Sequence, residues 1–198
     1  MVAVTVGSYG CGMAGWLDFS LACNETGPTH RSYWVVHGRF AAGAYPGKRE
    51  QGSVLHIEVL EELLAAGIDR FVNLTQDYPG GTDHHLNRYD SAVDGRGLVQ
   101  RFEIPDVGIP TVSVMVEILD AIDADLAEGH CPYVHCWGGI GRTGTTVGCW
   151  LIRHGHATPS DALDVLTVLR QGDVGAGYRR APETSEQRDF VKAWALGQ

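Results

Sequence analysis

The segment PYVHCWGGIGRTG, from Pro132 to Gly144, constrains the fold of this chain more strongly than any other segment. It begins as a short, mostly apolar stretch, as expected for a central strand that is covered on both faces. Three glycines follow in the five positions after the cysteine, and a helical pattern then runs from about Arg142 to His154. A buried strand that turns through glycines into a helix is typical of an α/β domain.

Strand and helix patterns also alternate along the rest of the 198 residues. A long polar loop is expected at 76–97, with one short helix at most. The alternation predicts a single α/β domain over 1–198, with a central, mostly parallel sheet flanked by helices and an irregular N-terminal extension at 1–30. We expect strands within 32–47, 70–75 and 98–104, and helices at 53–66, 111–128, 160–170 and 185–196.

The bulk composition restricts the function. A formal net charge of −9 argues against a general binder of nucleic acid or of anionic membranes, because such proteins need a basic face. No Lys or Arg precedes Arg31, and glycines interrupt the apolar residues before it, so we expect neither a secretory signal nor a membrane anchor. The five cysteines form no CxxC pair, which disfavours a zinc or disulfide framework and indicates a reducing, cytoplasmic location.

The glycines after Cys136 predict a specific chemistry. They allow the backbone to curl so that successive N–H groups point inward at the start of the next helix, where they bind a tetrahedral anion. The guanidinium of Arg142 can donate to two oxygens of that anion. The inward N–H groups, the start of the helix and the Arg142 charge should also lower the pKa of the Cys136 thiol below its usual value of about 8.5. A thiolate facing a bound phosphate is a nucleophile, and the Thr143 hydroxyl can donate to the sulfur when it leaves.

The sequence HCWGGIGRTG resembles the HC-x5-R-[ST]-G signature of the cysteine-dependent protein-tyrosine and dual-specificity phosphatases, and the resemblance extends over about 35–196. It implies that Cys136 is the nucleophile, that Arg142 binds phosphate, and that His135 supports the loop. No metal or other cofactor is implied, because Arg142 and the backbone dipoles supply the stabilising charge. The implied phosphate-binding positions are Trp137, Gly138, Gly139, Ile140, Gly141 and Thr143.

The reaction also needs a carboxylic acid on a loop opposite the nucleophile, to protonate the leaving oxygen. Asp106 lies in EIPDVGIP, between a strand and a helix, on a loop that should meet the anion loop at one end of the sheet. Its distance from Cys136 along the chain also fits the compact dual-specificity phosphatases. The alternative acids, all in the long loop 76–97, are Asp83, Asp90 and Asp94.

Two further features near the predicted site have a functional and a structural interpretation. Gln187 could orient the hydrolytic water, but Thr184 and Gln187 also form the pattern of a capping box, which we favour. Tyr78 or Tyr89 could line the mouth of the pocket from the long loop.

Two more features have a chemical alternative that we consider weaker. The DHH sequence at 83–85 resembles part of a metal phosphoesterase signature, but a solvated loop is the simpler interpretation. Cys131 or Cys149 could form a protective disulfide with Cys136, but such cysteines are more often small buried residues.

We therefore predict a phosphatase that hydrolyses phosphate monoesters through a cysteinyl-phosphate. The loop residues WGGIG are neutral, whereas phosphoinositide-directed relatives often carry lysines there, so we expect phosphotyrosine proteins as substrates and phosphoserine or phosphothreonine proteins as further candidates. Phosphoinositides or other small phosphate esters are the alternative substrates. A phosphopeptide-binding module without catalysis and a sulfur-transfer or arsenate-reducing enzyme are the alternative classes. Trp137 either packs beneath the loop or restricts access to it.

Overall fold

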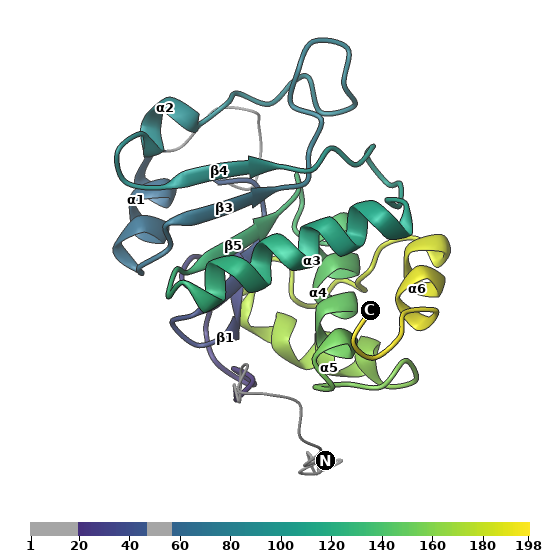
Figure 1. The fold of residues 1–198 in the computed structure, drawn as a ribbon. Helices are drawn as coiled ribbons and strands as arrows, with labels where there is room; N and C mark the ends of the chain where they lie inside the picture. The colour runs from purple at the N-terminus through teal and green to yellow at the C-terminus, as the bar shows by residue number, and fades with distance from the viewer. Residues whose placement is uncertain (1–19, 47–56) are drawn as a thin grey trace.

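The computed structural model describes residues 20–46 and 57–198, and these residues form one sheet of five strands (Figure 1). The order across the sheet is β1-β2-β5-β3-β4. Among these strands, β2, β5, β3 and β4 are parallel to one another, and β1 runs antiparallel beside β2. The predicted mostly parallel sheet is confirmed. The strands are β1 Ser32–Val36, β2 Phe40–Gly43, β3 Arg70–Asn73, β4 Leu98–Arg101 and β5 Pro132–His135.

Helices cover both faces of the sheet. Helices α1 and α2 lie on one side, and α3, α4, α5 and α6 lie on the other (Figure 1). The last helix ends at Lys192 instead of the expected 196, and the expected start of the first helix at Ser53 lies outside the described residues. In the described segments, each helix is too short or too polar to span a bilayer. The helices are α1 Ile57–Ala65, α2 Asp90–Val93, α3 Val112–Ala127, α4 Gly141–Arg153, α5 Ala162–Leu169 and α6 Ser185–Lys192, with a short 3-10 helix η1 at Arg170–Gly172.

Neighbouring residues of the central strands supply two separate hydrophobic cores. In β5, Val134 belongs to the core under α3 to α6, whereas Tyr133 belongs to the core under α1. In β3, Val72 and Phe71 divide in the same way. Successive side chains of a strand point to opposite faces, so the central strands of a sheet with helices on both faces carry apolar residues at neighbouring positions.

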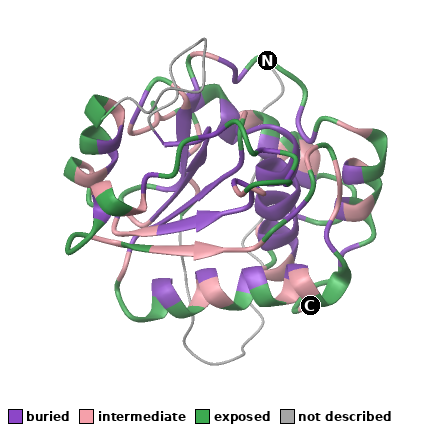
Figure 2. Ribbon diagram, turned by 90° about the horizontal axis from the view of Figure 1, so that it is seen from above, coloured by how far each residue is buried: buried purple, intermediate pink, exposed green. Residues whose placement is uncertain are grey.

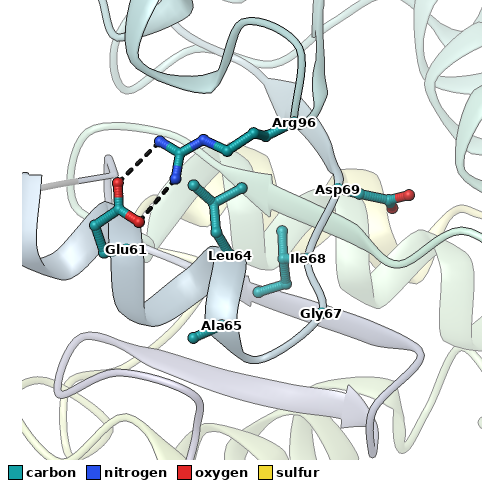
Figure 3. A pocket seen from close by; sticks show the side chains of 7 residues that line it. All are labelled: Glu61, Leu64, Ala65, Gly67, Ile68, Asp69 and Arg96. Atoms are coloured by element: carbon teal, nitrogen blue, oxygen red, sulfur yellow. Dashed lines mark hydrogen bonds and ion pairs between the residues drawn. The ribbon is translucent and has the colours of Figure 1, made fainter.

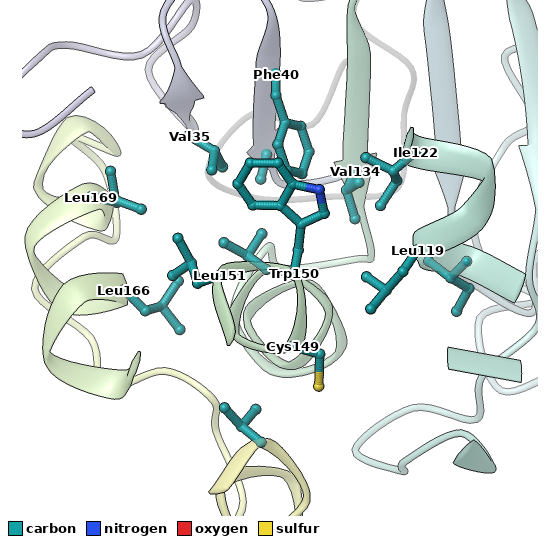
Figure 4. Packing of buried hydrophobic residues seen from close by; sticks show 14 of the residues in the cluster. Val35, Phe40, Leu119, Ile122, Val134, Cys149, Trp150, Leu151, Leu166 and Leu169 are labelled. Atoms are coloured by element: carbon teal, nitrogen blue, oxygen red, sulfur yellow. The ribbon is translucent and has the colours of Figure 1, made fainter. Parts of the chain in front are cut away.

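Helix α4 is the centre of the larger core, because every residue from Gly141 to Ile152 is buried (Figure 2). Trp150 packs edge-on against Phe40, with ring centroids 5.0 Å apart (Figure 4). Its indole N–H donates to the Asp123 carboxylate at 3.0 Å. These contacts hold α4, and therefore its first turn, in one position relative to the sheet.

The loops after β3, β4 and β5 all leave from the same edge of the sheet, since these strands are parallel. The loop after β5 carries Cys136, and the loop after β4 carries Asp106. The opposite edge has a surface pocket between α1 and the segments that precede β3 and β4 (Figure 3). There Arg96 and Glu61 form two hydrogen bonds of 2.8 Å. That pocket is separated from the cysteine loop by the length of the strands.

We predict that Gly148→Ala destabilises the protein by about 1 to 2 kcal/mol. The added carbon would lie 2.8 Å from Cγ1 of Val191, a stiff side chain between α4 and α6. This clash outweighs the gain in helix propensity of about 1 kcal/mol. Urea denaturation measures the change. In a double-mutant cycle, the effects of Gly148→Ala and Val191→Ala should be coupled, and simple additivity would contradict the packing described here.

Candidate active site

Cys136 lies where β5 ends, on the loop that leads into α4. It is buried, with 3% of its surface exposed. Burial alone would raise the pKa of its thiol, but the Arg142 charge, the Thr143 hydroxyl and the backbone N–H groups of Thr143 and Gly139 outweigh burial and lower it. The thiol therefore ionises more readily than a free cysteine, as a nucleophile requires.

The loop between Cys136 and α4 folds tightly against the end of β2. The N–H of Tyr45 donates to the carbonyl of Trp137 at 3.1 Å. Gly139 has a φ of +69°, and a Cβ there would lie 2.4 Å from the carbonyl carbon of Gly43, so no other residue fits. The structure places the predicted phosphate-binding residues around the cysteine, with Trp137, Gly138, Gly139 and Ile140 in the loop and Gly141 and Thr143 in the first turn of α4.

Arg142 is almost fully buried, and a carboxylate that sequence reasoning missed holds its guanidinium. Nη1 and Nη2 donate to the two carboxylate oxygens of Asp83 at 2.7 and 2.9 Å, as a bidentate pair. Nη1 also donates to the carbonyl of Ile104 at 3.0 Å, and Nη2 donates to Oδ1 of Asp106 at 2.8 Å. These bonds fix the plane of the guanidinium whose charge acts on Cys136.

Asp83 is therefore a partner of Arg142 and not a proton donor. Its side chain is 1% exposed. Burial would raise the pKa of its carboxyl, but Arg142 and the N–H of Gln76 outweigh burial and lower it. A carboxylate kept ionised in this way cannot serve as the acid, so that alternative is wrong. A buried arginine needs an acidic partner, and this rule could have indicated the aspartates of the loop 76–97 as candidates.

Asp106 lies on the loop between β4 and α3, as predicted, with 42% of its side chain exposed. Its backbone N–H donates to the Thr82 hydroxyl at 2.9 Å, and its carboxylate accepts from Arg142. The next residue, Val107, has a φ of +55°, which is unusual for a β-branched residue. The structure thus brings the predicted acid into contact with the arginine that faces the cysteine.

The other two alternative acids have different surroundings. Asp90 begins α2, and its carboxylate accepts two hydrogen bonds from Arg101, at 2.6 and 2.8 Å, which lower its pKa. Asp94 is exposed where α2 ends. Among the four aspartates considered, Asp106 is the one that is both exposed and in contact with Arg142.

Gln187 forms the capping box of α6, so the favoured interpretation is confirmed. Its side chain also connects two parts of the site. Nε2 donates to the carbonyl of Gly108 at 2.9 Å, in the same loop as Asp106. The amide lies against Gly141, where an added Cβ would be 2.9 Å away. Gln187 therefore ties the acid loop to the start of α4, and a contact with the hydrolytic water stays a prediction.

His135 is fully buried beneath the cysteine loop, among three tyrosine rings. The centroids of Tyr45, Tyr89 and Tyr133 lie 5.3, 5.5 and 5.7 Å from its own. The Tyr89 hydroxyl is 2.6 Å from Nε2. Burial lowers the pKa of His135 to about 3, so its ring is neutral at physiological pH. This environment agrees with a supporting role for His135, whereas the expectation that Tyr89 lines the pocket mouth is wrong.

Trp137 lies at the surface of the loop and not beneath it, with 39% of its area exposed. Its ring meets His85 edge to face, with centroids 5.7 Å apart. His85 belongs to the loop that also supplies Asp83. We call the pair Trp137 and His85 the aromatic edge of the site.

The DHH sequence has no metal-binding arrangement. Asp83 pairs with Arg142, Nδ1 of His84 is 2.9 Å from the carbonyl of Gly81, and His85 contacts Trp137. Within 20–46 and 57–198, no group of three His, Cys, Asp or Glu side chains could hold a metal ion.

Neither Cys131 nor Cys149 is placed to form a disulfide with Cys136. The four residues of β5 separate Cys131 from Cys136 by about 16 Å. Cys149 lies about 12 Å along α4 from its first residue. A disulfide needs Cα atoms within about 7 Å. Burial raises the pKa of Cys131 to about 12, and that of Cys149 is raised as well, so both are structural thiols.

A loop that lowers the pKa of its own cysteine, at the carboxyl ends of parallel strands, defines a class of protein together with the fold. That class is the cysteine-based phosphatases of the tyrosine and dual-specificity type.

Comparison with known proteins identifies the family. The family profile described as "Polymorphic toxin system, DSP-PTPase phosphatase" matches residues 47–156, which is more than half of the chain. The chain belongs to this family of DSP-PTPase phosphatases.

Individual relatives agree with this family. Tyrosine-protein phosphatase cdc-14 of Caenorhabditis elegans is 30% identical over 198 residues, covering 93% of this chain and 25% of that protein. Dual specificity protein phosphatase CDC14B of Mus musculus is 37% identical over 70 residues, covering 35% of this chain and 14% of that protein. The chain thus spans a quarter or less of the length of these relatives. The crystal structure of Tk-PTP in the active form is 27% identical with a TM-score of 0.59, over 78% of this chain and 89% of that chain.

We predict that Asp83→Asn lowers the free energy of unfolding by about 2 to 4 kcal/mol, because it leaves the buried Arg142 charge without its bidentate partner. Asp94→Asn is the matched control, and at its exposed position the change should stay within about 0.5 kcal/mol. Urea denaturation of both variants at pH 7 measures the difference. Equal losses would show that the pair does not contribute in this way.

We predict that His135 makes stability depend on pH. Its folded-state pKa of about 3 lies below the unfolded value of about 6.5, so the unfolded chain binds the additional proton. Stability contributed by the neutral ring is therefore present above pH 6.5 and is lost as the pH falls. Between pH 7 and pH 5 the free energy of unfolding of the wild type should fall by about 2 kcal/mol more than that of His135→Gln. Parallel pH curves for the two proteins would contradict this sign.

Proposed function

We propose that the protein hydrolyses phosphate monoesters, with Cys136 as nucleophile, Arg142 as the phosphate-binding cation and Asp106 as general acid. The observation that carries this proposal is the geometry around the buried Cys136, where Arg142 is held by Asp83 and contacts the acid Asp106. These surroundings lower the pKa of the Cys136 thiol. The buried Cys149 has a raised pKa instead, as burial alone dictates.

Phosphate binding in this proposal uses the N–H groups from Trp137 to Arg142 and the guanidinium. The helix leaves the first N–H groups of α4 without internal partners, and its dipole favours an anion there. In the structure Nη2 of Arg142 donates to Asp106 at 2.8 Å. A phosphate that takes Nε and Nη2 displaces Asp106 from Nη2 and frees its carboxyl to face the leaving oxygen. Substrate binding and placement of the acid are therefore coupled through one nitrogen.

The reaction then has two steps. The Cys136 thiolate attacks phosphorus, the S–P bond forms, the ester P–O bond breaks, and Asp106 gives its proton to the leaving oxygen. Water next attacks the cysteinyl-phosphate, Asp106 takes a proton from it, and the S–P bond breaks to release inorganic phosphate. The Thr143 hydroxyl stabilises the departing thiolate. The loop N–H groups and Arg142 stabilise the charge on the phosphoryl oxygens in both steps.

We infer that the substrates are phosphoproteins, with phosphotyrosine preferred and phosphoserine or phosphothreonine as further candidates. The aromatic edge of Trp137 and His85 suits an aryl ring next to the phosphate. The loop between Cys136 and Arg142 has no basic side chain to bind a second phosphate. The relatives named above carry the names tyrosine-protein phosphatase and dual specificity protein phosphatase, which agrees with this inference.

The inference extends to the compartment. Reducing conditions protect a thiolate nucleophile from oxidation, and the four cysteines of the described residues are free. We therefore propose a cytoplasmic location.

The test is hydrolysis of p-nitrophenyl phosphate in the presence of a chelator. We expect activity in the wild type, none in Cys136→Ser, and a loss of about 100-fold or more in kcat for Asp106→Asn. Cys23→Ser is the matched control, since Cys23 is a partly exposed free cysteine elsewhere in the chain, and it should keep full activity. A fully active Cys136→Ser protein would contradict the mechanism.

A substrate panel tests the finer proposal. Phosphotyrosine, phosphoserine and phosphothreonine peptides of one sequence are compared with phosphoinositide micelles by kcat/KM. We expect the phosphotyrosine peptide to have the highest value. A phosphoinositide with the highest value would support the alternative substrate class and leave the mechanism intact.

A further inference from the structure

Arg31, just before β1, reaches the cysteine loop with a side chain that is 13% exposed. Its Nη2 donates to the carbonyl of Gly138 at 3.0 Å. Its Nε donates to Oδ1 of the buried Asp173 at 3.3 Å. The backbone of Arg31 is fixed as well, because its carbonyl accepts the N–H of Ala44 at 2.9 Å. The guanidinium therefore connects the loop to a segment that follows α5 and η1.

The bond to Gly138 sets the direction of one peptide group. In a trans peptide the C=O and the N–H point in opposite directions. Because the Gly138 carbonyl is turned toward Arg31, the N–H of Gly139 is turned away from Arg31. That N–H is one of the groups that lower the pKa of Cys136. Arg31 and the thiol thus act on opposite ends of the same peptide dipole.

This peptide needs an external restraint. Glycine at both positions lowers the steric barrier to rotation of the Gly138–Gly139 peptide, and of the two residues only Gly139 packs closely against Gly43. A Cβ at Gly138 would meet a single side chain, at 3.9 Å, so the position is not closely packed. The preceding peptide is held by the backbone, since the carbonyl of Trp137 accepts the N–H of Tyr45. The hydrogen bond from Arg31 to the Gly138 carbonyl restrains the next peptide, between Gly138 and Gly139.

Contacts of its side chain and of the neighbouring backbone hold Arg31 in a fixed position. Asp173 compensates its charge, and the same Oδ1 accepts the N–H of Ala176 at 2.9 Å. The carbonyl of His30 accepts the N–H of Gly175 at 3.0 Å, so the backbone beside Arg31 is attached to the same turn. Because these contacts fix the position of the Arg31 side chain, its hydrogen bond also fixes the direction of the Gly138 carbonyl.

We propose that Arg31 is a positioning residue, which holds the Gly138–Gly139 peptide so that the N–H of Gly139 faces Cys136 and the bound phosphate. For the phosphate, this inference rests on the proposed function, whereas the effect on the thiol does not need a substrate. Arg31 and Asp173 both lie outside the residues 47–156 that match the family profile. The family match therefore does not include this contact.

The test compares Arg31→Met with Arg39→Met in the full chain. Arg39 is a matched control, because its Nη2 also donates to a backbone carbonyl, that of Leu126 at 2.8 Å, at the other edge of the sheet. Alkylation of Cys136 by iodoacetamide is followed against pH by mass spectrometry of its peptide, since only the thiolate reacts. We expect Arg31→Met to raise the midpoint of the curve of alkylation rate against pH by about one pH unit, so that alkylation at pH 6 is about tenfold slower. Arg39→Met should leave the curve unchanged.

Binding of inorganic phosphate, measured by calorimetry, should weaken about tenfold in Arg31→Met, and kcat/KM should fall by a similar factor. A wild type without hydrolytic activity would refute the proposed function, while the alkylation curves would still test Arg31. A folded Arg31→Met protein with the wild-type curve overturns the proposal.

If Arg31→Met does not fold, as judged by circular dichroism, Arg31→Lys decides the question. A single ammonium cannot bridge Gly138 and Asp173 as the guanidinium does, so the midpoint should again lie above the wild type. An unchanged midpoint in Arg31→Lys would then overturn the proposal.

Discussion

Three loops of this protein meet at one guanidinium. Arg142 contacts Asp83 from the loop after β3 and Asp106 from the loop after β4, and its charge acts on Cys136 at the end of β5. A charge buried this deeply must be paired, and each of these partners is a negative group or becomes one. The pairing therefore does two things at once. It makes burial of the arginine tolerable, and it assembles a nucleophile, an anion-binding cation and an acid around one point.

The fold supplies the rigidity that this arrangement needs. The three loops converge because β3, β4 and β5 are parallel, and the guanidinium is carried by the first turn of a helix that is buried on all sides. Contacts such as those of Trp150 and Gly148 prevent α4 from shifting relative to the sheet. Further contacts fix the conformation of the cysteine loop. Tyr45 and Arg31 donate to its carbonyls from the outside, and His135, held by Tyr89, lies beneath it. Core packing and site geometry are thus parts of one structure.

Sequence reasoning succeeded where the decisive residues are close together in the chain. The strand, the glycines and the helix around Cys136 occupy consecutive positions, so local pattern alone predicts the anion loop, and the capping box of α6 is equally local. It failed for Asp83 and Tyr89, which lie in a long loop whose path depends on distant contacts. The loop has several aspartates, and no local pattern distinguishes the one that meets Arg142. Arg31 was missed for the same reason, since Gly138 is 107 positions away.

The central claim is that Cys136 forms a covalent bond to phosphorus. Rapid acid quenching of the wild type with an aryl phosphate, followed by mass spectrometry, measures this directly. The account predicts a phosphoryl group on the peptide that contains Cys136, formed at least as fast as the ester is cleaved and absent from Cys136→Ser. Steady hydrolysis with no phosphorylated cysteine at any time point, and with activity retained in Cys136→Ser, would contradict it.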